Sequence, residues 1–384
     1  MELFYPHNIL AISSWYPTAN KPGFGIFVQR HLMEIAQRNT VNLLYFDFDS
    51  KVMDGASRCS IRVCGKLTEH IVAVGGRGGV LASFFRTVYW YLKLVVFGPL
   101  RNHQIKHLHI PYHIGIFIAP FLLLSFQPLI ISEHWSGYFR EDGRFSRLSF
   151  SSRLLLKALF RKASAITAVS KPLLDSMDEY FHVKDKANVI PNAYRKNMSC
   201  RNVDAIIPGR FLMVANINNA EKNITGVIEA FHRLWIQHPY VQLTIVGSGP
   251  DFKLVQDFRD HLGLSDHVCT LTGYVESKSL SMYYQQASCY VMNSNFETFS
   301  ISTLEALLFG VPVISTKCKG PESFVKDSNG LLIDVGNTGQ LESAMEYMLT
   351  HYRDYEPEKI RASIPAEMTV DIGVAFTDIY DDIL

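Results

Sequence analysis

Short apolar segments alternate with helical segments along this chain, and the alternation occurs twice. In the first half, strands are expected at 9–15, 41–48, 107–110, 129–134, 165–169 and 188–190. In the second half, they are expected at 211–217, 241–246, 268–272, 289–292, 311–316 and 330–334. Helices are expected at 28–37, 152–161, 221–237, 251–262, 278–286 and 338–349. Strands that alternate with helices predict parallel sheets covered by helices.

The length and the double pattern together predict two domains. A chain of 384 residues exceeds the ~250–300 residues that one core usually supports. We expect an α/β fold of two Rossmann-like, doubly wound domains at 1–195 and 208–365, facing an interdomain cleft at the carboxyl ends of their strands. A polar linker is expected at 193–208. The segment 369–384 is amphipathic at helical spacing, so it needs a surface to cover.

The composition excludes several classes of protein. Lys and Arg total 37 against 36 Asp and Glu, so the global charge does not favour nucleic-acid binding. Six cysteines without a Cys-x2-Cys pair indicate reduced thiols in the cytoplasm, neither a zinc site nor a disulfide framework. The N-terminus lacks the basic region and long apolar run of a secretory signal.

Two apolar stretches, 88–100 and 114–126, are shorter than the ~20 residues of a membrane span, and we interpret both as buried helices. The region of the first also carries aromatic and basic side chains, as a helix on a membrane surface would. These are Phe84, Phe85, Arg86, Tyr89, Trp90, Lys93 and Arg101. An interfacial helix is therefore the alternative to a core helix with solvated charges.

The segment 295–316, NFETFSISTLEALLFGVPVIST, places two carboxylates around the start of a helix. Ser302 is expected to begin this helix and Gly310 to end it, so Glu305 would lie on the first turn and Glu297 on the preceding loop. Unpaired N–H groups at a helix start suit a phosphate, and the carboxylates suit hydroxyls of a sugar and a ribose. This combination favours a nucleotide-sugar site. Alternatively, Ser302 and Glu305 form a capping box.

The Glu-x7-Glu spacing, the small-residue helix and the GVPVIST strand resemble the donor site of retaining GT-B glycosyltransferases of the group 1, or family 4, type. The resemblance implies two domains of the GT-B fold, with the last helix crossing back to the N-terminal domain. It implies transfer of a hexosyl or N-acetylhexosaminyl group from a UDP- or GDP-sugar to a glycan or lipid-linked acceptor, with retention and without a metal or other cofactor. The aromatic and basic side chains at 84–101 favour a lipid-linked or cell-envelope glycan as acceptor, hence polysaccharide biosynthesis, in a cytoplasmic protein with weak peripheral attachment to the inner face of the membrane.

The resemblance also implies roles for residues of the second half. Lys222 would grip the donor diphosphate, although Asn216 stands where the family has an Arg. On spacing alone, Lys222 is equally a solvated lysine of a first helical turn. The remaining donor-binding residues would be Gly247, Gly249, Gly273, Val275, Thr298, Phe299, Ser300, Ile301 and Glu305. Phe252 stands where a dinucleotide fingerprint needs its third glycine, which disfavours an oxidoreductase.

In the first half, Gly25 suits close backbone approach to a phosphate or sugar. His134 resembles a histidine that many members of the resembling family place beside the donor sugar. Glu133 alternates to the opposite face of its strand, and Asn192 would order the linker. The catalytic candidates are therefore His134, Lys222 and Glu297. Glu297 is the only strong candidate for a nucleophile of double displacement; in the resembling family it instead binds sugar hydroxyls, while the leaving phosphate accepts the acceptor's proton.

Three alternatives stay open. Asp47 and Asp49 form an Asp-x-Asp pattern that would hold a divalent cation in another class of glycosyltransferase, but two aspartates at a strand end are ordinary turn formers. A nucleotide-sugar epimerase would use the same cleft without an acceptor. A non-catalytic nucleotide-sugar-binding protein would account for Asn216 in place of Arg.

Overall fold

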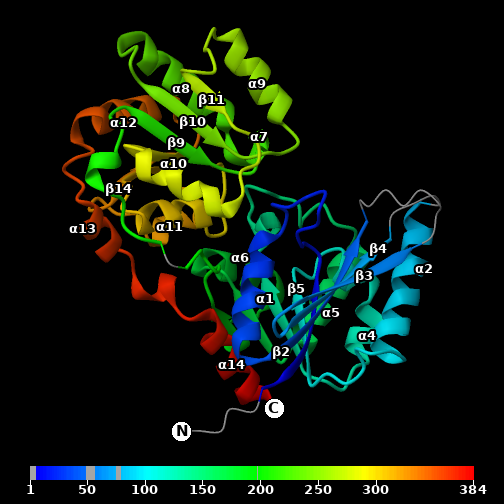
Figure 1. Cartoon of the computed structure of the whole chain (residues 1–384). Helices are drawn as coiled ribbons and strands as arrows, with labels where there is room; N and C mark the ends of the chain where they lie inside the picture. The colour runs from blue at the N-terminus through cyan, green and yellow to red at the C-terminus, as the bar shows by residue number, and fades with distance from the viewer. Residues whose placement is uncertain (1–5, 49–56, 75–78, 197) are drawn as a thin grey trace. The chain divides into compact units, whose positions relative to one another are not determined.

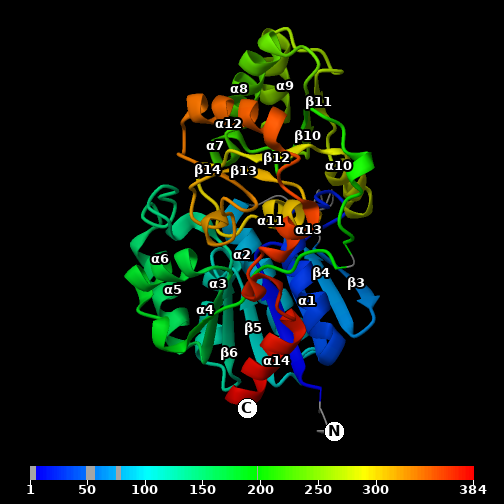
Figure 2. The same ribbon diagram turned by 90° about the vertical axis from the view of Figure 1, so that its left-hand side faces the viewer.

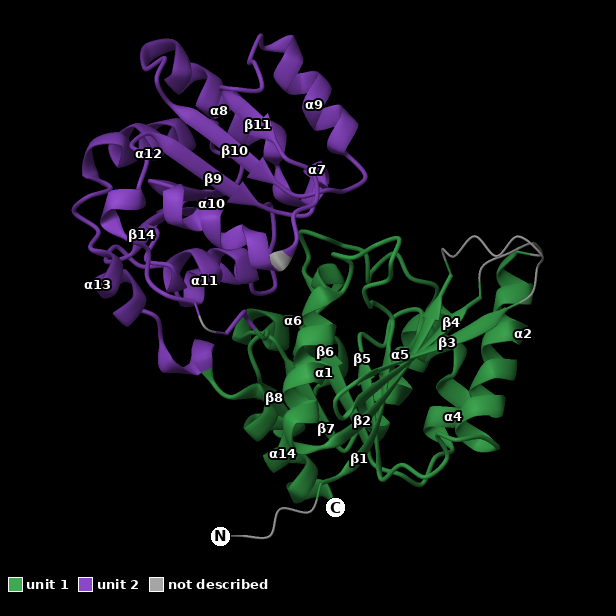
Figure 3. Cartoon of the chain, viewed as in Figure 1, with its two compact units in different colours: residues 1–193, 370–384 green, residues 194–369 purple. Residues whose placement is uncertain are grey.

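The structure is a computed structural model that describes residues 6–48, 57–74, 79–196 and 198–384. The chain forms two compact units (Figures 1 and 3). The first unit contains Met1–Ala193 and Val370–Leu384, and the second contains Tyr194–Thr369. The C-terminal segment thus belongs to the same unit as the N-terminal half.

The first unit is built on a sheet of order β3-β4-β2-β1-β5-β6-β7-β8. Its strands are β1 (Asn8–Ser13), β2 (Thr40–Asp47), β3 (Arg58–Cys64), β4 (Leu67–Ala73), β5 (Ile105–His109), β6 (Leu129–Glu133), β7 (Ala165–Ala168) and β8 (Ala187–Val189). All neighbouring pairs are parallel except β3 and β4. The six predicted strands are confirmed. Sequence analysis missed β3 and β4, because β3 is a mostly exposed edge strand and β4 has the polar Glu69 and His70 buried at its centre.

The helices of the first unit are α1 (Ile26–Arg38), α2 (Gly79–Tyr91), the π-helical η1 (Leu92–Val96), α3 (Ile114–Phe117), α4 (Ala119–Leu123), α5 (Phe150–Lys162), α6 (Lys171–Phe181) and α14 (Ile372–Ile383). The last of these, α14, packs along α1, as Figure 2 shows in red and blue. A Cβ on Gly373 would lie 2.6 Å from the carbonyl oxygen of Glu34, so glycine allows the two helices this close approach. Tyr380 of α14 also reaches the sheet, where its hydroxyl lies 2.8 Å from Nδ1 of His107.

The second unit has an all-parallel sheet of order β11-β10-β9-β12-β13-β14. Its strands are β9 (Arg210–Val214), β10 (Gln242–Val246), β11 (Cys269–Leu271), β12 (Cys289–Met292), β13 (Val313–Thr316) and β14 (Gly330–Ile333), which confirms the six predicted strands. The strand order reverses between β9 and β12. This is the doubly wound order, in which ligands bind where the reversal opens a crevice at the carboxyl ends of the strands.

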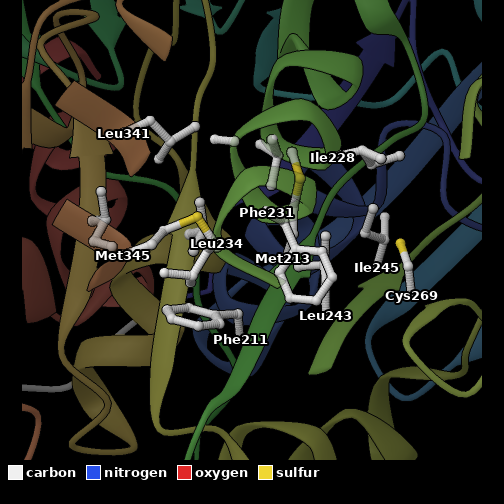
Figure 4. Packing of buried hydrophobic residues seen from close by; sticks show 14 of the residues in the cluster. Phe211, Met213, Ile228, Phe231, Leu234, Leu243, Ile245, Cys269, Leu341 and Met345 are labelled. Atoms are coloured by element: carbon white, nitrogen blue, oxygen red, sulfur yellow. The ribbon is translucent and has the colours of Figure 1, made fainter. Parts of the chain in front are cut away.

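The helices of the second unit are α7 (Asn219–Lys222), α8 (Ile224–Gln237), α9 (Phe252–His261), α10 (Leu280–Gln286), α11 (Ile301–Leu308), α12 (Thr338–His351) and α13 (Pro357–Ala362). One face of the sheet is covered by α8, α9 and α12, whose apolar side chains meet Phe211, Met213 and Leu243 of the strands (Figure 4). The single helix predicted at 221–237 is wrong. Asn223 adopts φ 45°, a left-handed conformation that ends α7 before α8 begins.

One-turn helices occur at η2 (Ser136–Tyr138), η3 (Lys184–Lys186), η4 (Val203–Ala205), η5 (Ser277–Ser279), η6 (Pro321–Ser323) and η7 (Ala366–Thr369). All six cysteines are free thiols. The apolar stretch predicted at 114–126 folds as the two short helices α3 and α4.

The helix predicted at 88–100 begins earlier and is less buried than expected. It runs as α2 and η1 from Gly79 to Val96, and its 18 residues are by length and composition apolar enough to cross a membrane. Only 22% of this segment is buried. The interpretation as a buried core helix is therefore wrong for this segment.

Candidate functional site

Lys222 and Glu297 meet where the strand order of the second unit reverses. Lys222 ends α7, which follows β9, and Glu297 lies on the loop that follows β12. The Lys222 Nζ atom lies 2.6 Å from Oε1 of Glu297, and the two side chains are only 17% and 14% exposed. The hydroxyl of Ser294 donates to the same carboxylate oxygen over 3.0 Å. Lys222 is therefore a paired, largely buried cation and not a solvated lysine.

The loop after β12 is fixed to α7 by backbone and side-chain hydrogen bonds. The N–H of Asn295 donates to the carbonyl of Glu221 over 2.8 Å, and its side-chain amide donates to the carbonyl of Ala220 over 2.9 Å. The side-chain amide of Asn293 donates to the carbonyl of Asn223 over 3.2 Å. Two segments far apart in the sequence thus hold the ammonium and the carboxylate together.

The loop after β13 holds Glu297 from its other side. The N–H of Glu297 donates to the carbonyl of Cys318, and the N–H of Gly320 donates to the carbonyl of Glu297, both over 3.0 Å. A Cβ on Gly320 would lie 2.6 Å from the backbone nitrogen of Phe299, so only glycine allows this approach. This loop was not predicted as part of the site, although the Lys319-Gly320-Pro321 sequence after a buried strand is a signal of a tight turn.

Replacement of Gly320 with alanine is expected to destabilise the second unit by about 1–3 kcal/mol, because the methyl group would displace backbone. Thermal and urea unfolding of the full chain measure the loss. Gly339→Ala is the matched control, since a Cβ there meets only the side-chain oxygen of Asn337, at 3.6 Å. Equal stability of the Gly320→Ala and Gly339→Ala proteins would contradict the close approach.

The electrostatics of the pair keep Lys222 charged. Burial opposes ionisation of Lys222, but the Glu297 carboxylate outweighs burial and raises the pKa of the ammonium above its usual value. An ammonium has three N–H donors, so it can hold the carboxylate and a phosphate oxygen at the same time. The site therefore contains a permanent cation beside a hydrogen-bond acceptor.

The helix α11 begins next to this pair. Its N-cap is Ser300, with φ 69° and no side-chain capping hydrogen bond, and its first residue is Ile301. The predicted start at Ser302 and the capping box with Glu305 are therefore wrong. Glu305 lies on the second turn of α11 and is only 3% exposed. Its predicted contact with a ribose stays a prediction.

Three residues with a strained backbone lie around the Lys222 and Glu297 pair. Asn223, Ser300 and Lys319 all have positive φ, at 45°, 69° and 82°, and they border the site on three different loops. Residues other than glycine rarely adopt a positive φ. Where they do, the surrounding structure enforces the strained backbone, and such residues cluster at functional sites. In this strained loop, Thr298 is half-buried and the Phe299 ring packs on Phe324.

The loops after β9, β10 and β11 approach each other through their backbones. The N–H of Gly247 donates to the carbonyl of Gly273 over 3.0 Å. A Cβ on Gly249 would lie 2.4 Å from the carbonyl oxygen of Ile217, which explains glycine at that position. Asn216 is exposed beside these loops, and Val275 is half-buried just beyond them. The predicted donor-binding residues of this region therefore share one edge of the sheet.

The first unit contains the two remaining site residues. Gly25 is the N-cap of α1 with φ 68°, and a Cβ there would lie 2.6 Å from backbone atoms of Trp15 and Tyr16. His134 follows β6, and its Nδ1 lies 3.0 Å from the side-chain oxygen of Asn192. Because that oxygen accepts, Nδ1 carries the proton. Asn192 therefore orients His134, a role that sequence analysis did not assign to it.

Glu133 holds the backbone that carries His134. Its carboxylate accepts hydrogen bonds from the Tyr138 hydroxyl over 2.6 Å and from the N–H groups of His134 and Trp135 over 3.0 and 3.2 Å. Burial raises the pKa of this carboxyl to about 7, although the three donors lower it. Glu133 thus acts as a positioning residue for the turn after β6.

Only the first aspartate of the Asp-x-Asp pattern is among the described residues. Asp47 ends β2 and is 8% exposed, and Asp49 lies outside the described residues. Within the part of the chain that the structure describes, no group of three or more His, Cys, Asp or Glu residues is arranged to hold a metal ion.

Two family models match this chain, one in each half. Residues 208–362 match the model described as glycosyl transferases group 1. Residues 28–195 match the model described as glycosyltransferase family 4. The two matches include all the predicted site residues except Gly25.

Similar proteins and structures agree with these models. A 2-deoxystreptamine N-acetyl-D-glucosaminyltransferase of Niallia circulans is 23% identical over 70% of this chain and 72% of its own length. An alpha-monoglucosyldiacylglycerol synthase of Acholeplasma laidlawii is 31% identical, over 32% of this chain and 31% of its own length. The crystal structure of Anabaena HepE in complex with UDP-glucose has a TM-score of 0.73 at 14% identity and covers 98% of this chain and 100% of that one. The structural likeness shows a shared two-domain fold.

Proposed function

Because this chain belongs to the group 1 glycosyltransferases, we propose that it transfers a hexosyl or N-acetylhexosaminyl group from a UDP- or GDP-sugar to a glycan or lipid-linked acceptor. The ion pair between Lys222 and Glu297 at the strand-order reversal is the observation that carries the proposal. It joins a cation for the diphosphate to a carboxylate for sugar hydroxyls. One relative is named for transfer to 2-deoxystreptamine, which is a cyclitol, and another for synthesis of a glycolipid, so the second name supports a lipid acceptor.

In the proposed reaction, the bond between the anomeric carbon and the diphosphate breaks while the acceptor oxygen bonds to the same carbon from the same face. The acceptor's proton passes to the departing phosphate oxygen. Negative charge develops on the diphosphate, where Lys222 and the N–H groups at the start of α11, from Ser300 onward, would stabilise it. This route gives retention without an enzymic nucleophile.

Glu297 would bind hydroxyls of the donor sugar. Its carboxylate already accepts from Lys222 and Ser294, and these bonds fix its orientation toward a ligand. Double displacement would require this carboxylate to attack the sugar, and the contacts with Lys222 and Ser294 already occupy its Oε1 atom. The pairing therefore favours the hydroxyl-binding role.

His134 would act as a hydrogen-bonding residue beside the donor sugar. Burial, followed by the neighbouring His31, holds the pKa of its imidazole well below the usual value. The ring is thus neutral near pH 7, with Nδ1 donating to Asn192. Nε2 is then an acceptor that is buried without a hydrogen-bond partner among the described residues, so it would accept from a sugar hydroxyl only once the ring becomes accessible.

We propose that the reaction needs no metal ion, since Lys222 supplies the positive charge that a divalent cation supplies to a diphosphate in other transferases. Cytoplasmic residence stays a prediction.

A panel of nucleotide sugars tests the proposal. The donor is expected to raise the melting temperature of the full chain, because a ligand that binds only the folded state stabilises it. With an acceptor present, the same donor should release its nucleotide and yield a product with the donor's anomeric configuration, in the presence of EDTA. Inversion would refute the same-face route, and loss of transfer in EDTA restored by Mg²⁺ or Mn²⁺ would refute metal independence. Isomerised sugar from donor alone would identify an epimerase.

A further inference from the structure

The helix formed by α2 and η1 has two apolar faces, and the first unit covers only one of them. Thr87, Tyr91, Leu94 and Val95 are its buried residues. On this inner face the ring of Tyr91 lies 5.1 Å from that of Phe121 in α4. Phe84 similarly packs on Phe117 of α3, at 5.9 Å. The helix is therefore an integral part of the first unit (Figure 1).

The other face forms an exposed stripe. Leu81, Phe85, Tyr89, Lys93 and Phe97 recur at a spacing of four, which places them in one row along a helix. The four apolar members are 68%, 61%, 55% and 78% exposed, in that order. The stripe runs from Leu81 to Phe97, so at about 1.5 Å per residue it extends roughly 24 Å. We call these five residues the outer stripe.

The sequence segment that contains the outer stripe has basic residues and no acidic ones. Residues 70–132 contain five arginines and lysines and no aspartate or glutamate. The Lys93 ammonium lies 4.5 Å from the ring centre of Trp90 and 5.6 Å from that of Tyr89. Its aliphatic stem thus runs along aromatic surface while the charge stays at the surface. Aromatic and aliphatic side chains with cations among them are typical of helices that lie in a bilayer interface.

We propose that the outer stripe inserts into the interface of an anionic phospholipid bilayer, with α2 and η1 parallel to the membrane plane. The basic, acid-free segment complements the negative surface of such a bilayer, and the apolar row supplies the buried area. The helix lies on the membrane and does not cross it, because Tyr91, Leu94 and Val95 are buried against the first unit. This proposal is independent of the transfer reaction.

Co-sedimentation of the full chain with vesicles tests the proposal. Binding is expected to vesicles of phosphatidylcholine containing about a third phosphatidylglycerol, to weaken with salt, and to be much weaker with phosphatidylcholine alone. Replacing Leu81, Phe85 and Tyr89 with serine is expected to lower the affinity at least about ten-fold, since three large apolar side chains leave the interface. Lys93→Gln should lower it about five-fold on anionic vesicles only.

The matched control replaces Ile236, Leu254 and Met282 with serine, because these apolar side chains of the second unit are 62%, 52% and 53% exposed. It should bind as the unchanged chain does. Melting curves establish that each variant is folded. Three outcomes would overturn the proposal: no binding to anionic vesicles, equal binding to neutral ones, or equal binding by the triple serine variant of the stripe. The first outcome would leave a protein partner as the occupant of the stripe, the second would remove the role of anionic lipid, and the third would place the membrane contact elsewhere.

Discussion

Replacing Lys222 with alanine is expected to lower kcat by about 10²- to 10³-fold, because one positioned charge that stabilises a leaving group contributes about this much. The change removes the cation that lies 2.6 Å from Glu297 at the reversal of the strand order. The measurement is the initial rate of nucleotide release with a saturating donor and acceptor. Lys222→Arg should keep more of the rate, since the guanidinium retains the charge but changes its geometry.

The Lys222→Ala protein also leaves Glu297 without its partner in a largely buried position, which we expect to cost on the order of 3 kcal/mol of stability. The double change Lys222→Ala and Glu297→Gln removes both charges. It should recover stability, which would attribute the stability loss of the Lys222→Ala protein to the unpaired carboxylate, while its rate stays low because Glu297 is itself a donor-binding residue. Lys253→Ala removes an exposed lysine paired with Asp257 at 2.6 Å and serves as the control. A folded Lys222→Ala protein within a few-fold of the normal kcat would contradict the role of Lys222.

The parallel sheets could be predicted because their strands are buried on both faces and read as continuous apolar runs. The pairing of Lys222 with Glu297 could not, since 75 residues separate them and only the strand order brings the loops after β9 and β12 together. The break at Asn223 could not be predicted either, because its cause is a tertiary contact. The apolar period continues across it, while the left-handed conformation is enforced by hydrogen bonds from the loop that contains Asn293.

The start of α11 also could not be predicted from sequence rules. Ser302 follows the sequence rule for a cap, but the helix begins earlier because the N–H of Gly320 and the carbonyl of Cys318 fix the preceding loop at Glu297. Ser300 then adopts a conformation that sequence rules reserve for glycine. Conversely, the aromatic and basic character of α2 was visible in the sequence. Its exposure was not, because apolar periodicity cannot distinguish a core-facing row from a membrane-facing one.

Four buried histidines of the first unit form a cluster: His31 on α1, His107 and His109 on β5, and His134 after β6. The ring centres of His107 and His109 are 4.1 Å apart, those of His31 and His134 5.1 Å, and those of His109 and His134 5.8 Å. Burial lowers the pKa of His31 to about 4 and that of His107 to about 3. Burial and the neighbouring imidazoles hold the pKa values of His109 and His134 well below 6.5.

Acid is therefore expected to unfold the first unit steeply. Each of these histidines has a lower pKa in the folded chain than the ~6.5 of the unfolded one, so between these values the unfolded chain binds more protons. Stability rises with pH in this window and is lost as pH falls from about 6.5 toward 4, at about 1.4 kcal/mol per pH unit for each histidine. Glu133 acts in the opposite direction, since a raised pKa of about 7 favours the folded state as its carboxyl protonates. One carboxyl cannot offset four imidazoles.

Urea unfolding of the full chain between pH 7.5 and about 5 measures this dependence, and the unfolding free energy should fall by several kcal/mol, a large part of the ~5–15 kcal/mol typical of a folded domain. His109→Leu removes a cluster member whose two ring nitrogens have no hydrogen-bond partner among the described residues, and it should reduce the slope by about 1.4 kcal/mol per pH unit. His267→Gln, at an exposed position of the second unit, controls for the loss of a histidine outside the cluster. An unfolding free energy that does not change over this range would show that the cluster takes up protons while folded, and that its imidazoles are reached by water.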